Sequence, residues 1–232
     1  MNATLRAEDR LIFALDVDDE DRARALVRRL RPHVGLFKMG LETLMAGGMA
    51  RVARLAEGHP VFVDAKLHDV PATVARSVRQ IVKGPNPVRY ITVHNCVREA
   101  VEACEGRAAI LRVTVLTSIE ARDLGGHEAL TARVLRRAEE AVRAGAEGVI
   151  CAPAEVRAVR AALGRDVTVV TPGVRPAWAA VAGDDQARTA SPEEAVRAGA
   201  DRVVVGRPIR DAERPEEAAR RIVEALSALG SE

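Results

Sequence analysis

Short apolar runs recur along the chain, each followed by a longer stretch in which apolar and charged residues alternate with a helical period. A short apolar run is typical of a strand buried on both faces, and the longer stretches are typical of amphipathic helices. The pattern predicts eight strands, which run over Leu11–Leu15, Leu36–Met39, Val61–Val63, Tyr90–His94, Ile110–Val115, Gly148–Cys151, Thr168–Thr171 and Arg202–Val205. It predicts helices between and after them, over Asp19–Leu30, Leu44–Ala56, Pro71–Val82, Arg98–Cys104, Ala129–Ala144, Ala154–Leu163, Pro192–Ala198 and Pro215–Leu229.

This alternation indicates the fold class. Strands separated by helices pair in parallel through right-handed crossovers. Eight such units within 232 residues favour a closed barrel over an open doubly wound sheet. Asp16–Asp19, which follows the first strand, lacks the glycine-rich turn of a dinucleotide-binding fold. We therefore predict an α/β protein with one (β/α)8-barrel domain over residues 1–232, of which residues 1–10 form an N-terminal extension.

Composition argues against several classes of protein. Apolar residues make up 48% of the chain and charged residues 29%, as in a globular protein with a full core. The net charge is only +2 and aromatic residues make up 2%, so the basic stripe and stacking rings of a nucleic-acid binder are missing. No apolar run approaches the roughly 18 residues of a membrane span, and the polar N-terminus does not resemble a secretory signal. We expect a cytoplasmic protein that binds neither nucleic acid nor membrane.

The three cysteines support the same location. Cys96, Cys104 and Cys151 are odd in number and do not have the spacing of a zinc site. We expect buried thiols in a reducing cytosol, without a disulfide or metal role.

The basic residues have an unusual distribution. Of the 35, only Lys38, Lys66 and Lys83 are lysine. Arginine does not release its proton in a protein, whereas lysine does. Lysines retained against this bias are therefore candidates for a proton donor. Lys83 is the exception, because it lies in a predicted loop and is expected to be an ordinary surface residue.

Charged residues also mark the ends of the first three predicted strands. Asp16 ends the first, Lys38 lies late in the second, and Asp64 and Lys66 end the third. Strand residues two apart share a face, and the active sites of these barrels lie at the C-terminal strand ends. Charges in a barrel mouth are costly unless paired, so we expect a network of alternating acids and lysines. Ordinary ion pairs at the strand ends are the alternative.

A second cluster lies near the C-terminus. Thr171–Arg175 leaves the seventh strand, and Val205–Arg207 leaves the eighth. Barrels of this type often bind phosphate here, through backbone N–H groups and an arginine. Arg207, which follows a glycine, fits that role. The polar loop over residues 175–190 is long enough to act as a lid.

With these motifs in their order and spacing, the chain resembles the bacterial type of the orotidine 5′-phosphate decarboxylase family from about Leu11 to Ala225. The segments that carry the resemblance are Ala14–Val17, Phe37–Gly40, the Asp-x-Lys-x-x-Asp run Asp64–Asp69 with Val70, Pro71 and Thr73, Leu116–Ser118, Thr171–Pro176, Asp184–Gln186 and Val204–Ile209. His94–Arg98 departs from the family, since it replaces a small, glycine-rich segment. We expect His94 to be a structural residue at the strand end.

The resemblance implies decarboxylation of orotidine 5′-phosphate to UMP and CO2 in de novo pyrimidine biosynthesis, without a cofactor or metal. The implied catalytic residues are Lys66, which would protonate C6 of the pyrimidine, Asp64 beside the substrate carboxylate, Lys38 in the charge network, and Asp69, contributed to the neighbouring subunit's site in a homodimer. The implied substrate-binding residues are Asp16, Lys38, Asp64, Thr73, Thr117, Arg175, Gln186, Gly206 and Arg207. Among them Asp16 and Lys38 would hold the ribose, Thr117 would contact the pyrimidine, and Arg175, Gln186, Gly206 and Arg207 would form the phosphate-and-lid set.

Two other functions are alternatives. A metal-dependent sugar-phosphate decarboxylase or aldolase on a similar barrel would share the Asp-x-Lys-x-x-Asp run, but Val70–Pro71 and the region of Thr117 favour the nucleotide enzyme. A catalytically silent barrel that binds a nucleotide or phosphate would not require the complete set of acids and lysines that this chain retains.

Overall fold

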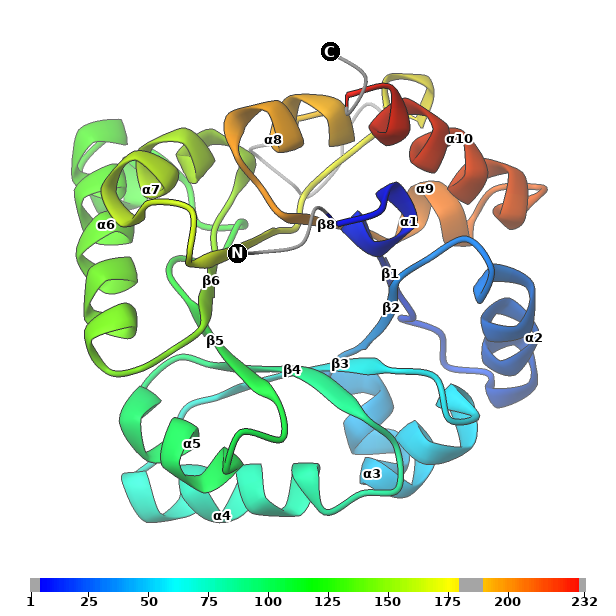
Figure 1. Ribbon diagram of the computed structural model, residues 1–232, viewed down its shortest axis with the longest axis horizontal. Helices are drawn as coiled ribbons and strands as arrows, with labels where there is room; N and C mark the ends of the chain where they lie inside the picture. Colours follow the sequence, from blue (N-terminus) through cyan, green and yellow to red (C-terminus); the bar gives the residue numbers. More distant parts are fainter. Residues whose placement is uncertain (1–4, 180–189, 230–232) are drawn as a thin grey trace.

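The fold is a closed barrel of parallel strands. The computed structural model describes residues 5–179 and 190–229, and within these ranges eight strands follow one another in chain order around the barrel (Figure 1). Their bounds are β1 (Leu11–Ala14), β2 (Leu36–Met39), β3 (Val61–Leu67), β4 (Val88–Val93), β5 (Ala109–Val113), β6 (Gly148–Ile150), β7 (Thr168–Thr171) and β8 (Arg202–Val205). β8 pairs with β1, with Leu11 opposite Val203, which closes the barrel. The predicted (β/α)8 barrel is confirmed.

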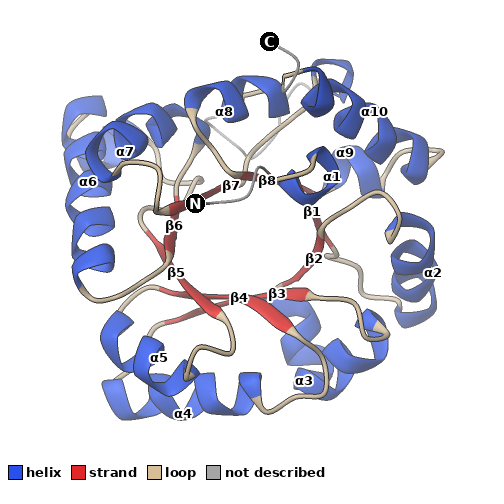
Figure 2. Cartoon of the chain, viewed as in Figure 1, coloured by secondary structure: helices blue, strands red, loops and turns tan. Residues whose placement is uncertain are grey.

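Helices surround the barrel on its outside, except for α1 (Ala7–Arg10), which lies beside β1 and β8 at one end of the barrel (Figure 2). The others are α2 (Glu20–Leu30), α3 (Leu41–Ala56), α4 (Pro71–Val82), α5 (Val97–Cys104), α6 (His127–Arg143), α7 (Val156–Leu163), α8 (Pro192–Ala198), α9 (Arg207–Arg210) and α10 (Pro215–Ala228). Three 3₁₀ turns lie among the described residues, at Ala121–Leu124, Pro153–Glu155 and Ala177–Ala179. The pattern did not predict α1 or α9, since four residues are too few to show a helical period. No helix in the described ranges has the length and apolarity that a membrane crossing requires.

Alternation along the strands creates two apolar layers. The inner layer fills the barrel and consists of Ile12, Ala14, Leu36, Phe62, Tyr90, Leu111, Val113, Ile150, Val170 and Val204. The residues between them, such as Phe13, Phe37 and Ile91, face the helices and form the outer layer. Because side chains two apart share a face, Lys38, Asp64 and Thr92 continue the inner rows that begin at Leu36, Phe62 and Tyr90. Their polar groups therefore point into the barrel at its C-terminal end.

The opposite end of the barrel is filled by Arg202, which is 7% exposed. Its guanidinium lies 5.6 Å from the centre of the Tyr90 ring and donates a hydrogen bond to the carbonyl of Asp9. Asp9 belongs to α1, which lies beside β1 and β8 in Figure 1. The short helix thus caps the N-terminal end and leaves the C-terminal end as the accessible mouth.

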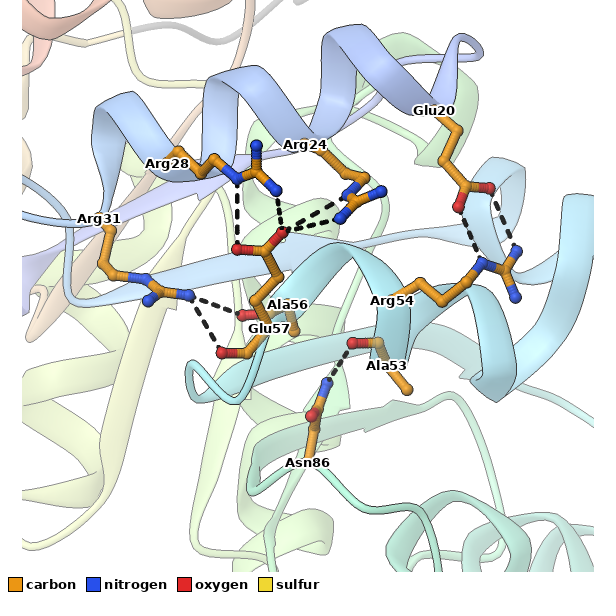
Figure 3. Close-up of polar contacts among 9 residues, drawn as sticks. All are labelled: Glu20, Arg24, Arg28, Arg31, Ala53, Arg54, Ala56, Glu57 and Asn86. Atoms are coloured by element: carbon orange, nitrogen blue, oxygen red, sulfur yellow. Dashed lines mark hydrogen bonds and ion pairs between the residues drawn. The ribbon is translucent and has the colours of Figure 1, made fainter.

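Helices α2 and α3 are joined by an ion-pair cluster (Figure 3). Glu57 follows α3 in a left-handed conformation, and its carboxylate accepts hydrogen bonds from Arg24 and Arg28 of α2. A second pair, Arg54 of α3 with Glu20 of α2, lies at 2.8 Å. These contacts hold the two helices against each other.

Candidate active site

A cavity of about 460 Å³ opens at the C-terminal ends of the strands. Its lining includes apolar side chains, Phe62, Val113 and Ile150 among them. Of the charged side chains that line it in the described ranges, five are basic and two acidic: Lys38, Lys66, Arg175, Arg207, Arg210, Asp16 and Asp64. A cavity of this size with an excess of positive charge fits a small anionic molecule that has one apolar part.

Asp64 is the centre of the charge network. It is 7% exposed, and its Oδ2 lies 2.6 Å from Nζ of Lys66 and 3.4 Å from Nζ of Lys38. Lys38 Nζ also lies 3.4 Å from Oδ1 of Asp16. The structure therefore brings the four strand-end residues together as an alternating row of acids and ammonium groups. Each buried charge in the row has an opposite charge beside it, which offsets the cost of removing it from water.

The carboxyl group of Asp64 is held in its charged form. Burial acts to raise its pKa, but the positive charges of Lys38 and Lys66, with hydrogen bonds from Lys66 and Thr92, more than offset burial and lower the pKa below its usual value. Asp64 thus contributes a negative charge to the cavity lining at neutral pH.

The backbone at Lys66 is irregular. Its φ is 47°, in the left-handed region, and the pairing of β3 with β4 shifts register between Val63 and Leu67. Thr92 of β4 spans this irregularity: its Oγ1 accepts a hydrogen bond from the Lys66 amide at 2.9 Å and donates one to Oδ1 of Asp64 at 2.8 Å. The sequence pattern did not single out Thr92, although its position two residues after Tyr90 places it on the inner face.

Asp69 and Thr73 do not line the cavity of their own chain. Asp69 is exposed in the connection from β3 to α4, where its carboxylate accepts a hydrogen bond from the Val70 amide. Its carbonyl accepts hydrogen bonds from Asn95 Nδ2 at 2.9 Å and Cys96 Sγ at 3.4 Å. Asn95 and Cys96 thus support the loop that carries Asp69.

The other end of the cavity is rich in arginine. Arg175 follows β7, Gly206 and Arg207 follow β8, and all three line the cavity together with Thr117 from the β5–α6 connection. Gly173, also in the lining, has φ of 76°, a conformation that glycine adopts without strain. Gln186, the remaining residue expected in this set, lies outside the described residues.

Arg210 is a further basic residue of the site that the sequence pattern did not single out. It lies one turn after Arg207 in α9 and lines the cavity. Its guanidinium pairs with Asp211 at 2.7 Å and donates to the carbonyl of Asp16 at 3.1 Å. Arg210 therefore connects the loop after β1, which holds Asp16, to the arginine end of the cavity.

His94 lies beside the network and outside the residues found to line the cavity. Its amide donates to the carbonyl of Leu67, and its half-buried ring lies 5.7 Å from the ring of His68. Burial lowers the pKa of His94, and the positive charges of nearby side chains act in the same direction. These contacts agree with a structural residue that is neutral near pH 7.

The cysteines differ in burial. Cys104 and Cys151 are buried, as expected, whereas Cys96 is half-buried, so the expectation was wrong for Cys96. Its position in the exposed loop beside Asp69 explains the difference. In the described part of the chain, no three histidine, cysteine or acidic side chains are grouped so that they could hold a metal ion.

Comparisons with known proteins agree with this geometry. The model of the family described as "Orotidine 5'-phosphate decarboxylase / HUMPS family" matches residues 9–222. The orotidine 5′-phosphate decarboxylase of Anaeromyxobacter dehalogenans is 46% identical over 231 residues, which cover 96% of this chain and 100% of the relative. The protein of the same name from Heliobacterium modesticaldum is 40% identical over 241 residues, covering 96% of this chain and 98% of the relative.

Solved structures show the same likeness. The crystal structure of orotidine 5′-phosphate decarboxylase from Lactobacillus acidophilus is 30% identical with a TM-score of 0.79, and the match covers 94% of this chain and 99% of that one. The enzyme of the same name from Pyrococcus horikoshii is 26% identical with a TM-score of 0.73, covering 93% of this chain and 98% of that one.

Proposed function

The chain belongs to the orotidine 5′-phosphate decarboxylase / HUMPS family, and from this premise we propose that it decarboxylates orotidine 5′-phosphate to UMP and CO2 in pyrimidine biosynthesis. The observation that carries the proposal is the two-ended cavity. One end presents the ammonium of Lys66, held at 2.6 Å by Asp64, and the other presents arginines that suit a phosphate. The family description spans more than one activity, and the relatives named above favour the decarboxylase over the metal-dependent alternative.

The chemistry asks the protein to stabilise a carbanion. When the bond between C6 and the carboxyl carbon breaks, CO2 leaves and the electron pair stays on C6, where the ring does not delocalise it. A fixed ammonium in a water-poor cavity stabilises such a charge. Lys66 then transfers a proton from Nζ to C6, which gives UMP and a neutral lysine that solvent reprotonates.

Asp64 and Lys38 prepare Lys66 for this step. The 2.6 Å contact with Asp64 fixes where the ammonium lies, and Lys38 Nζ lies 3.4 Å from the same carboxylate oxygen. Asp64 would face the leaving carboxylate of the substrate, so the repulsion between them would fall as CO2 forms. This proposal makes Lys66, Asp64 and Lys38 catalytic residues of one chain.

The rest of the substrate would occupy the remaining lining. Asp16 and Lys38 would bind the ribose hydroxyls, Thr117 would contact the pyrimidine, and Gly206 and Arg207 would bind the phosphate. Arg175 belongs to the same phosphate set, as does Gln186 outside the described residues. Enzymes lower barriers by roughly 8–23 kcal/mol, more than one ammonium supplies, so binding energy from the phosphate end must contribute to the rate.

We also propose that the active enzyme is a homodimer. Asp69 and Thr73 lie outside the cavity of their own chain, and Asp69 is exposed. Exposed apolar side chains follow the two neighbouring strands, Leu41 and Met45 in α3 after β2 and Val70 after β3, and they would suit a subunit contact. Across it, Asp69 would complete the charge network of the neighbouring subunit.

Three further properties belong to the proposal. Residues 1–232 form one domain, the protein acts in the cytoplasm, and no cofactor takes part. The charge network itself can stabilise the carbanion, which is the task that decarboxylases often give to a cofactor.

The test is an ultraviolet assay for the loss of orotidine 5′-phosphate, run on the wild-type chain with and without EDTA. We expect activity that survives EDTA, and Lys66→Ala should abolish turnover while its circular dichroism stays that of the wild type. An inactive wild-type chain would contradict the function, activity lost with EDTA would favour the metal-dependent alternative, and near-normal turnover of Lys66→Ala would remove the mechanism.

A further inference from the structure

Thr92 has a feature that neither the charge network nor the phosphate end explains. Its side chain is completely buried, with 0% exposure, yet it carries a hydroxyl on the inner face of the barrel. Buried hydroxyls are costly unless they are hydrogen-bonded. This one makes two hydrogen bonds, one to the side chain of Asp64 and one from the backbone of Lys66.

We propose that Thr92 is a positioning residue for the decarboxylation, whose hydroxyl sets the carboxylate of Asp64 and the backbone of Lys66 in one fixed arrangement. The inference rests on the proposed function. Thr92 would not touch the substrate, since it is absent from the residues found to line the cavity. It would act through the two residues that do.

The two hydrogen bonds have distinct effects. The single hydroxyl proton goes to Oδ1 of Asp64, which fixes the rotation of the carboxylate and leaves Oδ2 for Lys66 and Lys38, at 2.6 and 3.4 Å. An oxygen lone pair of Thr92 accepts the Lys66 amide at 2.9 Å, where the register of β3 and β4 is broken. A methyl group in place of the hydroxyl can do neither.

The backbone of Lys66 makes the second bond important. With φ of 47°, this residue holds a conformation that L-amino acids adopt only when the surroundings enforce it. The hydrogen bond between the Lys66 amide and Thr92 holds the backbone in this conformation. Without it, the chain between Asp64 and Leu67 is free to relax, and the direction of the Lys66 side chain changes.

The test compares Thr92→Val, which keeps the shape and loses the hydroxyl, with Thr92→Ser, which keeps the hydroxyl. Because a misplacement of about 1 Å costs on the order of 100-fold in rate, we expect Thr92→Val to lower kcat by about 10- to 100-fold. The KM for orotidine 5′-phosphate and the affinity for UMP should change little, since the phosphate end is intact. Thr92→Ser should keep kcat within about threefold of the wild type.

Thr114→Val is the matched control. Thr114 is equally buried and follows the neighbouring strand β5, but its hydroxyl donates to the carbonyl of Ile150, away from the charge network. This variant should lose stability in thermal unfolding and keep its kcat. If Thr92→Val and Thr114→Val lose stability to the same degree and also lose kcat to the same degree, the inference is wrong.

A second readout isolates the proton step. By microscopic reversibility, an enzyme that protonates C6 also exchanges the C6 hydrogen of UMP with deuterium in D2O, and Thr92→Val should slow this exchange about as much as it lowers kcat.

If Thr92→Val does not fold, Thr92→Cys takes its place as the variant with a weaker hydrogen bond. Wild-type kcat in the variant lacking the hydroxyl, or an equal loss in Thr92→Ser, would refute the role of Thr92. Inactivity of the wild type would instead refute the proposed function.

Discussion

At Lys66 the proton donor and a strained backbone coincide. The left-handed conformation costs an L-residue roughly 1–2 kcal/mol relative to the ordinary regions, whereas glycine adopts it at little cost. The hydroxyl of Thr92 accepts a hydrogen bond from the Lys66 amide, and the carboxylate of Asp64 forms an ion pair with its ammonium, so both ends of the residue are held in place. The strain therefore lies at the residue on which the chemistry depends, and it persists because surrounding contacts determine it.

This strain predicts an order of stability between two inactive variants. Lys66→Gly and Lys66→Ala both lack the ammonium, but only glycine relieves the backbone, so Lys66→Gly should be more stable by about 1 kcal/mol in urea unfolding. At Arg79, an exposed residue in α4, the order should reverse, with the glycine variant less stable than the alanine variant by about 1 kcal/mol. Equal stability of the two Lys66 variants would show that the strain is absent.

Among the elements, the junction of α2 and α3 shows how exposed charges can fix a helix pair. Glu57 lies among several arginines, and Arg31 also donates to the carbonyls of Ala56 and Glu57 at the end of α3 (Figure 3). Hydrogen bonds from Arg28 lower the pKa of Glu57, and Arg24 acts in the same direction. One carboxylate thus neutralises a group of like charges that would otherwise repel one another.

Replacing Glu57 by glutamine should therefore lower the unfolding temperature, because the arginines of α2 are left facing one another. The decrease should shrink in 1 M salt, where charges are screened within about 3 Å. Glu105→Gln is the control: Glu105 has the same left-handed backbone with φ of 51°, but its ion pair is with Arg107 of the same loop. A decrease at Glu57 no larger than at Glu105 would contradict the role of the cluster.

The elements also show what the pattern could predict. Apolar runs identified every strand, because burial on both faces leaves a signal that does not depend on tertiary contacts. The bounds differ most at β3, whose apolar run covers Val61–Val63 and whose strand continues through the charged residues Asp64 and Lys66 to Leu67. The register of β3 against β4 shifts between Val63 and Leu67, and the hydrogen bond from the Lys66 amide to Thr92 is a tertiary contact that a period of two does not predict.

Some residues of the candidate site could also be predicted from the sequence, and others could not. The period of two placed Asp64 and Lys66 on one face, and the scarcity of lysine singled out Lys38 and Lys66 from the sequence alone. Thr92 and Arg210 were missed because a threonine in a strand and an arginine in an arginine-rich chain carry no signal of their own. Their roles depend on which atoms the fold places beside them.

For the whole molecule, the separation of Asp69 from its own cavity has a direct test. If each site takes Lys66 from one chain and Asp69 from the other, mixing Lys66→Ala chains with Asp69→Asn chains should restore activity in heterodimers. One of the two sites in such a dimer contains both residues, so recovery should approach half of the wild-type activity per heterodimer. The measurement is turnover after subunit exchange, verified with differently tagged chains.

Each variant alone, incubated in the same way, is the control and should remain inactive. A mixture that exchanges subunits and regains nothing would mean that Asp69 acts within its own chain. Such a result would contradict the shared site and not the proposed decarboxylase activity.

The pairing of β1 with β8 has a consequence for how the protein is made. Leu11–Ala14 leaves the ribosome early and has to wait for Arg202–Val205, a delay on the order of 10–40 s at about 5–20 residues per second. Until then the growing chain carries an unpaired strand edge, which other chains could extend. Gly206 and Arg207 emerge immediately after that last strand. A newly made chain can therefore bind phosphate through these residues only when β8 pairs with β1 and the barrel closes.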